Sequence, residues 1–220
     1  HISRKSINRY LERMRFTYKL LAPVPYERNP IIRAEHRQFV AQFPHEMFIF
    51  IDESSKNSLT STRKRGYQQK CRKKRPYVCN FVKRHRLSVM AALDCHGILG
   101  YNIVEGSFTA ELFNIAFIQE VLPYLGYFMF KEERSIVVMD NCRVHNSDLV
   151  KMIRAKGAIV LFLPPYSPDL NPIEFAFHFM KSWLRRYRGF AEMQPKISIG
   201  RALEEITEQI AENFIHSCGY

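Results

Sequence analysis

Residues 47–53, Met-Phe-Ile-Phe-Ile-Asp-Glu, form a continuous apolar run that stops at two acidic residues. A short apolar run without alternation is typical of a strand that is buried on both faces of a sheet. We therefore expect a strand over Met47–Ile51 that carries Asp52 at its carboxyl end. A second apolar run, Ser135–Met139, ends in the same way at Asp140.

The segments around these two runs alternate between strand and helix patterns. Two further runs flank a four-residue turn, Asp94–Gly97, and predict a hairpin. The expected elements are strands over Leu87–Leu93, Ile98–Val104 and Ala158–Leu163, and helices over Thr109–Leu125, Ser147–Ala155, Pro172–Arg188 and Ser198–His216. This order predicts an α/β fold, a mixed sheet with flanking helices. Because ligands gather at the carboxyl ends of strands, Asp52 and Asp140 should lie together if their strands are neighbours.

The first 46 residues have a different texture. Ser6 is expected to cap a short helix with one apolar and one basic face. Such a helix fits the last part of a helix-turn-helix and fits an ordinary surface helix equally well. A proline-rich linker follows, and Asn29-Pro30 predicts the start of a second helix. Because the chain begins at His1, part-way into a helical pattern, we expect it to be a piece of a longer protein.

Composition and charge narrow the function classes. The chain has 220 residues, of which 46% are hydrophobic, which is enough for one well-buried core. Its net charge is +12, and 21 of the 33 Lys and Arg residues but only 6 of the 21 Asp and Glu residues lie in residues 1–90. This imbalance favours a polyanionic partner. No apolar stretch approaches the roughly 18 residues that a spanning helix needs, so we expect nucleic acid rather than a membrane.

Much of the positive charge falls in one expected loop, residues 54–76, which holds nine basic residues and no acidic one. Lys and Arg side chains there would contact phosphates without reading sequence. A solvated loop, or a nuclear-import signal over Arg72–Arg75, is the alternative. The candidate DNA-binding residues are Arg63, Lys64, Arg65, Lys70, Arg72, Lys73, Lys74 and Arg75.

The acidic residues at the strand ends suggest a metal site. Two carboxylates that share a cleft repel each other, and divalent cations relieve that repulsion. Glu174, in the first turn of a helix that follows Asn171-Pro172, is the candidate third ligand; a capping box with Asn171 is an equally good interpretation. Glu53 is not expected to join them, since adjacent residues of a strand point to opposite faces.

Three blocks carry a resemblance to a known family. They are residues 50–54 (Phe-Ile-Asp-Glu-Ser), 138–145 (Val-Met-Asp-Asn-Cys-Arg-Val-His) and 163–174 (Leu-Pro-Pro-Tyr-Ser-Pro-Asp-Leu-Asn-Pro-Ile-Glu). Together they resemble the signature blocks of DDE transposases of the mariner superfamily, including its insertion-sequence branch. The 34 positions between Asp140 and Glu174 are close to the family spacing.

The resemblance implies a division of the chain and a set of site residues. It implies a ribonuclease H-like catalytic domain over residues 47–220, a linker and helix over 23–46, and a helix-turn-helix remnant over 1–22. Asp52, Asp140 and Glu174 would be the catalytic, metal-binding triad. Asn141 and His145 match the family's asparagine and histidine, and we expect them to support the ligands; a capping or core histidine is the alternative for His145.

The resemblance also implies a mechanism and partners. Two Mg²⁺ (or Mn²⁺) ions would serve hydrolysis of a phosphodiester at each element end and strand transfer to target DNA. The expected partners are double-stranded DNA, as element ends and target, and a second copy of the chain as a homodimer on DNA. The location would be the nucleus in a eukaryote, otherwise the bacterial cytoplasm. The alternatives are a domesticated or decayed transposase that only binds DNA, and a structure-selective nuclease on the same scaffold.

Overall fold

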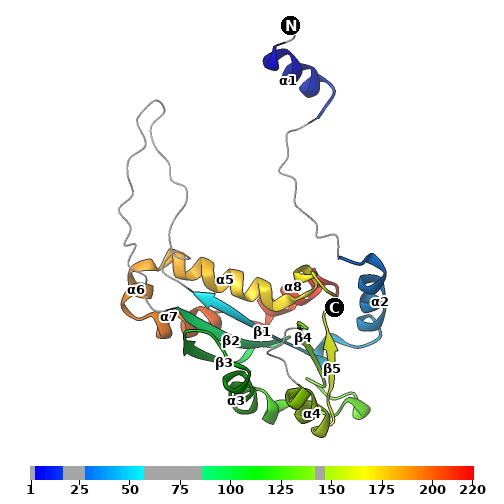
Figure 1. Cartoon of the computed structure of the whole chain (residues 1–220), viewed down its shortest axis with the longest axis vertical. Helices are drawn as coiled ribbons and strands as arrows, with labels where there is room; N and C mark the ends of the chain where they lie inside the picture. Colours follow the sequence, from blue (N-terminus) through cyan, green and yellow to red (C-terminus); the bar gives the residue numbers. More distant parts are fainter. Residues whose placement is uncertain (1–2, 17–27, 57–85, 142–146) are drawn as a thin grey trace.

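The computed structural model describes residues 3–16, 28–56, 86–141 and 147–220. At its centre lies a five-stranded sheet with the order β3-β2-β1-β4-β5 (Figure 1). The strands are β1 (Phe48–Lys56), β2 (Leu87–Asp94), β3 (Gly97–Glu105), β4 (Ile136–Met139) and β5 (Ile159–Phe162). β1 and β3 are each antiparallel to β2, whereas β1, β4 and β5 are parallel. The predicted mixed α/β sheet is confirmed.

Helices cover both faces of this sheet. α5, α7 and α8 pack on one face, and α3 and α4 pack on the other (Figure 1). The helices are α1 (Arg4–Arg13), α2 (Pro30–Val40), α3 (Ala110–Glu120), α4 (Ser147–Ala155), α5 (Pro172–Arg186), α6 (Arg188–Met193), α7 (Pro195–Glu204) and α8 (Glu208–Cys218). Short 3-10 turns lie at η1 (His45–Met47), η3 (Leu122–Tyr124), η4 (Phe128–Phe130) and η5 (Pro168–Leu170).

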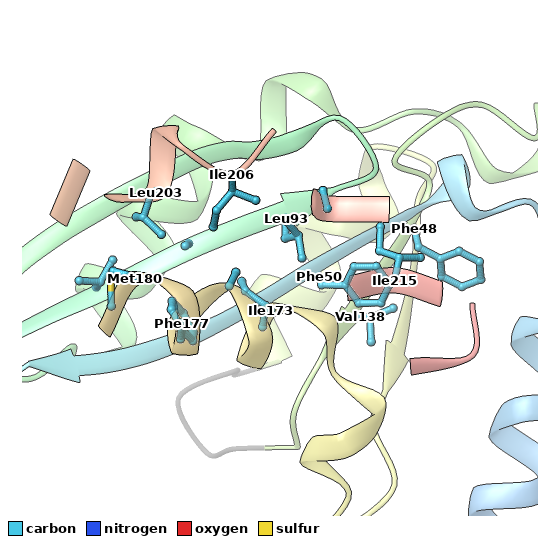
Figure 2. Packing of buried hydrophobic residues seen from close by; sticks show 14 of the residues in the cluster. Phe48, Phe50, Leu93, Val138, Ile173, Phe177, Met180, Leu203, Ile206 and Ile215 are labelled. Atoms are coloured by element: carbon cyan, nitrogen blue, oxygen red, sulfur yellow. The ribbon is translucent and has the colours of Figure 1, made fainter. Parts of the chain in front are cut away.

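The two central strands are buried on both faces, which explains why their sequences do not alternate. Phe48 and Phe50 of β1 pack with α5, α7 and α8 (Figure 2), whereas Ile49 and Ile51 pack with α3 and α4. β4 repeats this pattern: Ile136 and Val138 face the first layer, and Val137 and Met139 the second. The even-numbered residues of β1 and β4 therefore point toward α5.

The end of β1 differs from the prediction. The strand does not stop at Ile51 but continues to Lys56, because its pairing with β2 runs from Phe50↔Leu93 to Lys56↔Leu87. Pairing with β4 ends earlier, at Phe50↔Val138. Asp52 thus lies inside β1, two residues beyond the last residue that pairs with β4.

Two other predicted boundaries are also wrong. The expected single helix over Ser198–His216 is two helices, because the chain turns after Glu205 and Thr207 takes an extended conformation at the N-cap of α8. In α1 the cap is Ser3 rather than Ser6, since the Ser3 hydroxyl accepts a hydrogen bond from the Ser6 N–H.

Other local predictions are confirmed. The Asn29 side chain accepts hydrogen bonds from the backbone at the start of α2. β2 and β3 form the expected hairpin, and Gly97 in its turn has φ +132, with its β position 2.7 Å from the Ile206 carbonyl oxygen. Of the predicted helix-turn-helix, the described residues include only α1, so that assignment stays a prediction.

No single helix in the described ranges is long and apolar enough to cross a membrane. One pair of segments, Ala110–Glu120 with Leu122–Phe130, passes the length and composition test jointly but is bent by 42°.

Candidate active site

Asp52 and Asp140 are neighbours across the two central parallel strands. β1 and β4 pair as Phe48↔Ile136 and Phe50↔Val138, and continuing this register by two residues sets Asp52 opposite Asp140. Asp52 is even-numbered in β1, so its side chain points toward the layer that contains α5, and Asp140, directly after β4, lines the same cleft. Glu53 is odd-numbered in β1, so its side chain points to the other face of the sheet, as expected.

Glu174 reaches the same place from α5. Its helix begins at Pro172, directly after η5, and Glu174 is an exposed residue of the first turn. A cavity of about 440 Å³ is lined by Asp52, Asp140 and Glu174, together with Asn141, Asn171 and residues 163–168. Three side chains from distant parts of the sequence therefore line one cleft.

Asn171, which the sequence predicts as a helix cap, contacts a carboxylate of the cleft instead. It occupies the N-cap position of α5, but its side chain makes no capping hydrogen bond there. Instead Nδ2 donates to Asp52 Oδ2 over 3.0 Å, while Asp52 Oδ1 accepts from the Glu53 N–H at 2.7 Å. Asn171 is 1% exposed, and its Oδ1 is buried without a hydrogen-bond partner among the described residues. The orientation of Asp52 is thus set from the base of α5.

The loop between β5 and α5 is held from outside by α2 and the residues before it. Arg33 binds Asp169 with two hydrogen bonds of 2.7 and 3.0 Å, and Arg28 adds a third of 2.6 Å. The hydrogen bonds from Arg33, with both guanidinium charges, lower the pKa of the Asp169 carboxyl below its usual 3.8. The Arg33 side chain is buried, so this contact is shielded from water on one side.

Tyr220 anchors the same loop from the other end of the chain. Its hydroxyl donates to the Leu170 carbonyl oxygen at 3.0 Å, and its ring packs edge-on against Phe48 and Phe50. Since the phenol proton is used in this way, His36 Nε2, 2.9 Å away, is the donor to the Tyr220 oxygen. Burial raises the pKa of Tyr220, which keeps the phenol neutral. Asp169 and Leu170, the two residues directly before Asn171, are therefore both held in place, which fixes the start of the helix that carries Glu174.

The donor chemistry of the cleft fits a hard divalent cation, since carboxylate oxygens are the ligands that Mg²⁺ and Mn²⁺ prefer. Within the described residues, however, no three His, Cys, Asp or Glu side chains are close enough together to form a metal site. Carboxylate donors from β1, from the residue after β4 and from α5 nevertheless line the same cleft.

Two groups of predicted residues remain to be placed. Asn141 is exposed at the cleft beside Asp140. His145 lies outside the described residues, and so do all eight candidate DNA-binding residues from Arg63 to Arg75.

A mixed sheet with one aspartate inside β1, another directly after β4 and a glutamate on a covering helix has the arrangement of a ribonuclease H-like fold. The profile of the DDE superfamily endonuclease family matches residues 47–195. The chain belongs to this family of endonucleases.

Solved structures of a mariner transposase share the fold. The Mos1 mariner paired-end complex with Mn has a TM-score of 0.71 at 16% identity, over 99% of this chain and 68% of that chain. A pre-cleavage Mos1 transpososome has a TM-score of 0.66 at 15% identity, over 100% and 72%. A Mos1 catalytic domain solved with raltegravir and Mg has a TM-score of 0.58 at 13% identity, over 92% of each chain. No curated protein matches the chain.

Proposed function

We propose that this chain is the catalytic part of a DNA transposase that hydrolyses a phosphodiester at each element end and then joins the freed 3′-hydroxyl to target DNA. The observation that carries the proposal is the single cleft shared by Asp52, Asp140 and Glu174 in a member of the DDE family. Structures of Mos1 include a paired-end complex with its left transposon end and a strand transfer complex, which supports the same two steps here.

The three carboxylates are proposed to hold two Mg²⁺ or Mn²⁺ ions, as the Mos1 paired-end complexes with Mn and with Mg suggest. Such ions would activate the attacking oxygen and stabilise the leaving oxygen at phosphorus. Asn171 then serves to keep Asp52 turned into the cleft, and we propose that Asn141 and His145 support the ligands.

The remaining partners follow from charge and from the reaction. We propose that the eight candidate DNA-binding residues from Arg63 to Arg75 bind the phosphate backbone of double-stranded DNA, both element ends and target. Two ends must be joined, so the active species is proposed to be a homodimer on DNA. The proposed location is the nucleus if the host is a eukaryote, and the cytoplasm if it is a bacterium.

Cleavage of DNA that carries the element's inverted ends tests the proposal. With the full-length protein in Mg²⁺, Asp52→Asn, Asp140→Asn and Glu174→Gln should each lose at least about 10²-fold in cleavage rate, because each removes a carboxylate proposed to hold the ions that stabilise the charge at phosphorus. DNA affinity should change little. Glu53→Gln is the matched control, since it changes a carboxylate on the other face of β1. Cleavage by Asp140→Asn at the parent rate would end the assignment.

The alternatives give different outcomes in the same assays. A protein that does not respond to Mn²⁺ yet binds DNA tightly and in a salt-sensitive manner would be a DNA-binding protein only. Cutting of branched or hybrid substrates without element ends would indicate a structure-selective nuclease.

A further inference from the structure

Tyr166 lies in the wall of the cleft with its ring turned to solvent. It belongs to the proline-rich segment, residues 163–168, that lines the cavity with Asp52 and Asp140. Its neighbour Ser167 is buried, whereas Tyr166 is 57% exposed. In the described part of the chain, no ring contact or hydrogen bond involves the Tyr166 side chain. A large flat apolar surface is therefore left uncovered at the place where the reaction is proposed to occur.

The backbone of Tyr166 is held in a conformation that favours glycine. Its φ is +53, and among the four described non-glycine residues with positive φ it is the one that lines the cleft. The turn is fixed on both sides: the Ser167 hydroxyl donates to the Pro165 carbonyl oxygen at 3.1 Å, and the Leu170 N–H donates to the Ser167 carbonyl oxygen at 3.0 Å. Strain of this kind persists where the surrounding structure over-determines it, and it clusters at ligand sites.

Phe175 is also an exposed aromatic side chain close to the cleft, but it is less available than Tyr166. Phe175, beside Glu174, is 41% exposed, but its ring stacks on Phe214 with a centroid distance of 5.8 Å and an interplanar angle of 20°. Tyr166 is the neutral, flat group that lines a cleft whose charged lining residues are the three carboxylates. The carboxylates themselves repel DNA phosphates, so a contact between Tyr166 and a base would add binding beside the proposed metal ions.

We propose that Tyr166 is a stacking platform for an unpaired nucleobase next to the phosphate that is cleaved. This inference rests on the proposed function for its substrate. Bases stack on aromatic side chains without regard to sequence. The rigid turn holds the ring in place before DNA arrives, which lowers the entropic cost of binding.

Fluorescence of a forked DNA duplex with 2-aminopurine in its unpaired arm tests the proposal. The assay uses the full chain in an Asp140→Asn background, so that the probe is bound and not cut. Stacking on Tyr166 should quench the emission, and Tyr166→Phe should quench it equally. Tyr166→Gly should abolish the quenching and weaken binding of the forked probe about 5- to 150-fold. Because glycine relaxes the positive φ, this variant should melt no earlier than the parent background.

Tyr124→Ala is the matched control, since it removes a tyrosine that is 55% exposed and outside the cleft lining, and it should leave quenching and affinity unchanged. Quenching by Tyr166→Gly at the parent level, or its loss in Tyr166→Phe, would overturn the proposal. The chain without the Asp140 change is assayed separately with element-end DNA and Mg²⁺. Quenching that depends on Tyr166 without any cleavage would overturn the proposed function and leave this inference standing.

Discussion

Asn171 stands where an asparagine ordinarily satisfies the free N–H groups of a helix, yet its amide is directed at a strand. The helix loses a cap, and among the described residues Oδ1 has no hydrogen-bond partner, which is unfavourable for a residue that is 1% exposed. What it gains is a donor on a carboxylate of the cleft. Hydrogen bonds to ionised groups are about twice as strong as neutral ones, so the orientation of Asp52 is well defined.

We expect Asn171→Ala to weaken Mn²⁺ binding and Mg²⁺-dependent cleavage by about 10- to 100-fold, as is usual when a group that orients a metal ligand is removed. Titration calorimetry with Mn²⁺ measures the affinity without reference to turnover. Asn213→Ala, at an exposed position on α8, is the control and should change neither quantity. Parent-like Mn²⁺ affinity in Asn171→Ala would show that Asp52 needs no help from the amide.

The triad and Asn171 mark how far local sequence can predict this site. Asp52 and Asp140 could be found because each directly follows an uninterrupted apolar run, and such runs are buried parallel strands. Asn171-Pro172 fits a helix start so well that the cap interpretation was the natural one. The true partner of Asn171 lies 119 positions away, and no local pattern carries that information.

At the scale of elements, the loop over residues 163–171 depends on parts of the chain outside the family match. Arg33 belongs to α2, and Tyr220 follows α8; both hold the loop just before Asn171. The segment before the catalytic domain is therefore part of the framework of the cleft.

A double-mutant cycle with Arg33→Met and Asp169→Asn measures the strength of this anchor. We expect a coupling free energy in the lower part of the range of about 0.5–3 kcal/mol, because the contact is bidentate but the Asp169 side chain is 48% exposed and screened by water. Chemical unfolding of the four proteins gives the value. The exposed pair Lys151 and Asp148 is the control and should couple by no more than about 0.5 kcal/mol. Equal coupling in the two pairs would mean that Arg33 does not hold the loop.

Element types were predictable from the sequence, whereas several boundaries were not. The run Met47–Ile51 indicates a strand, but the extension to Lys56 depends on pairing with β2, which local hydrophobicity does not report. The break between α7 and α8 is similar, because apolar residues recur through it and the turn at Thr207 is set by packing against the sheet.

At the scale of the whole molecule, acid should lower the free energy of unfolding through His36, which links α2 to Tyr220. Burial, with Arg33 and Arg37 nearby, lowers the pKa of His36 below 6.5. Above pH 6.5 His36 is neutral in both states and contributes nothing to the pH dependence. Below it the unfolded chain takes up a proton that the folded chain resists, so the free energy of unfolding falls until the lowered pKa is passed.

Urea unfolding across pH 6.5 measures this effect. Relative to the parent, His36→Gln should lose less stability as the pH is lowered through that window, because its titrating group is gone. His178→Gln, at an exposed position on α5, should follow the parent curve. Identical pH slopes for His36→Gln and the parent would contradict the prediction.

Asp52 faces the cleft only because an exact number of residues separates it from the start of its strand, and the same holds for Asp140 after β4. The site should therefore be sensitive to the length of these two segments. Loss of one codon between Phe48 and Asp52 would move the carboxylate to the opposite face of the sheet, away from Glu174 and toward α3. The hydrophobicity of the strand would hardly change. Gene copies with such a one-residue deletion should therefore encode a protein that folds but does not cleave DNA. Restoring the number of residues, with any apolar residue, should restore cleavage.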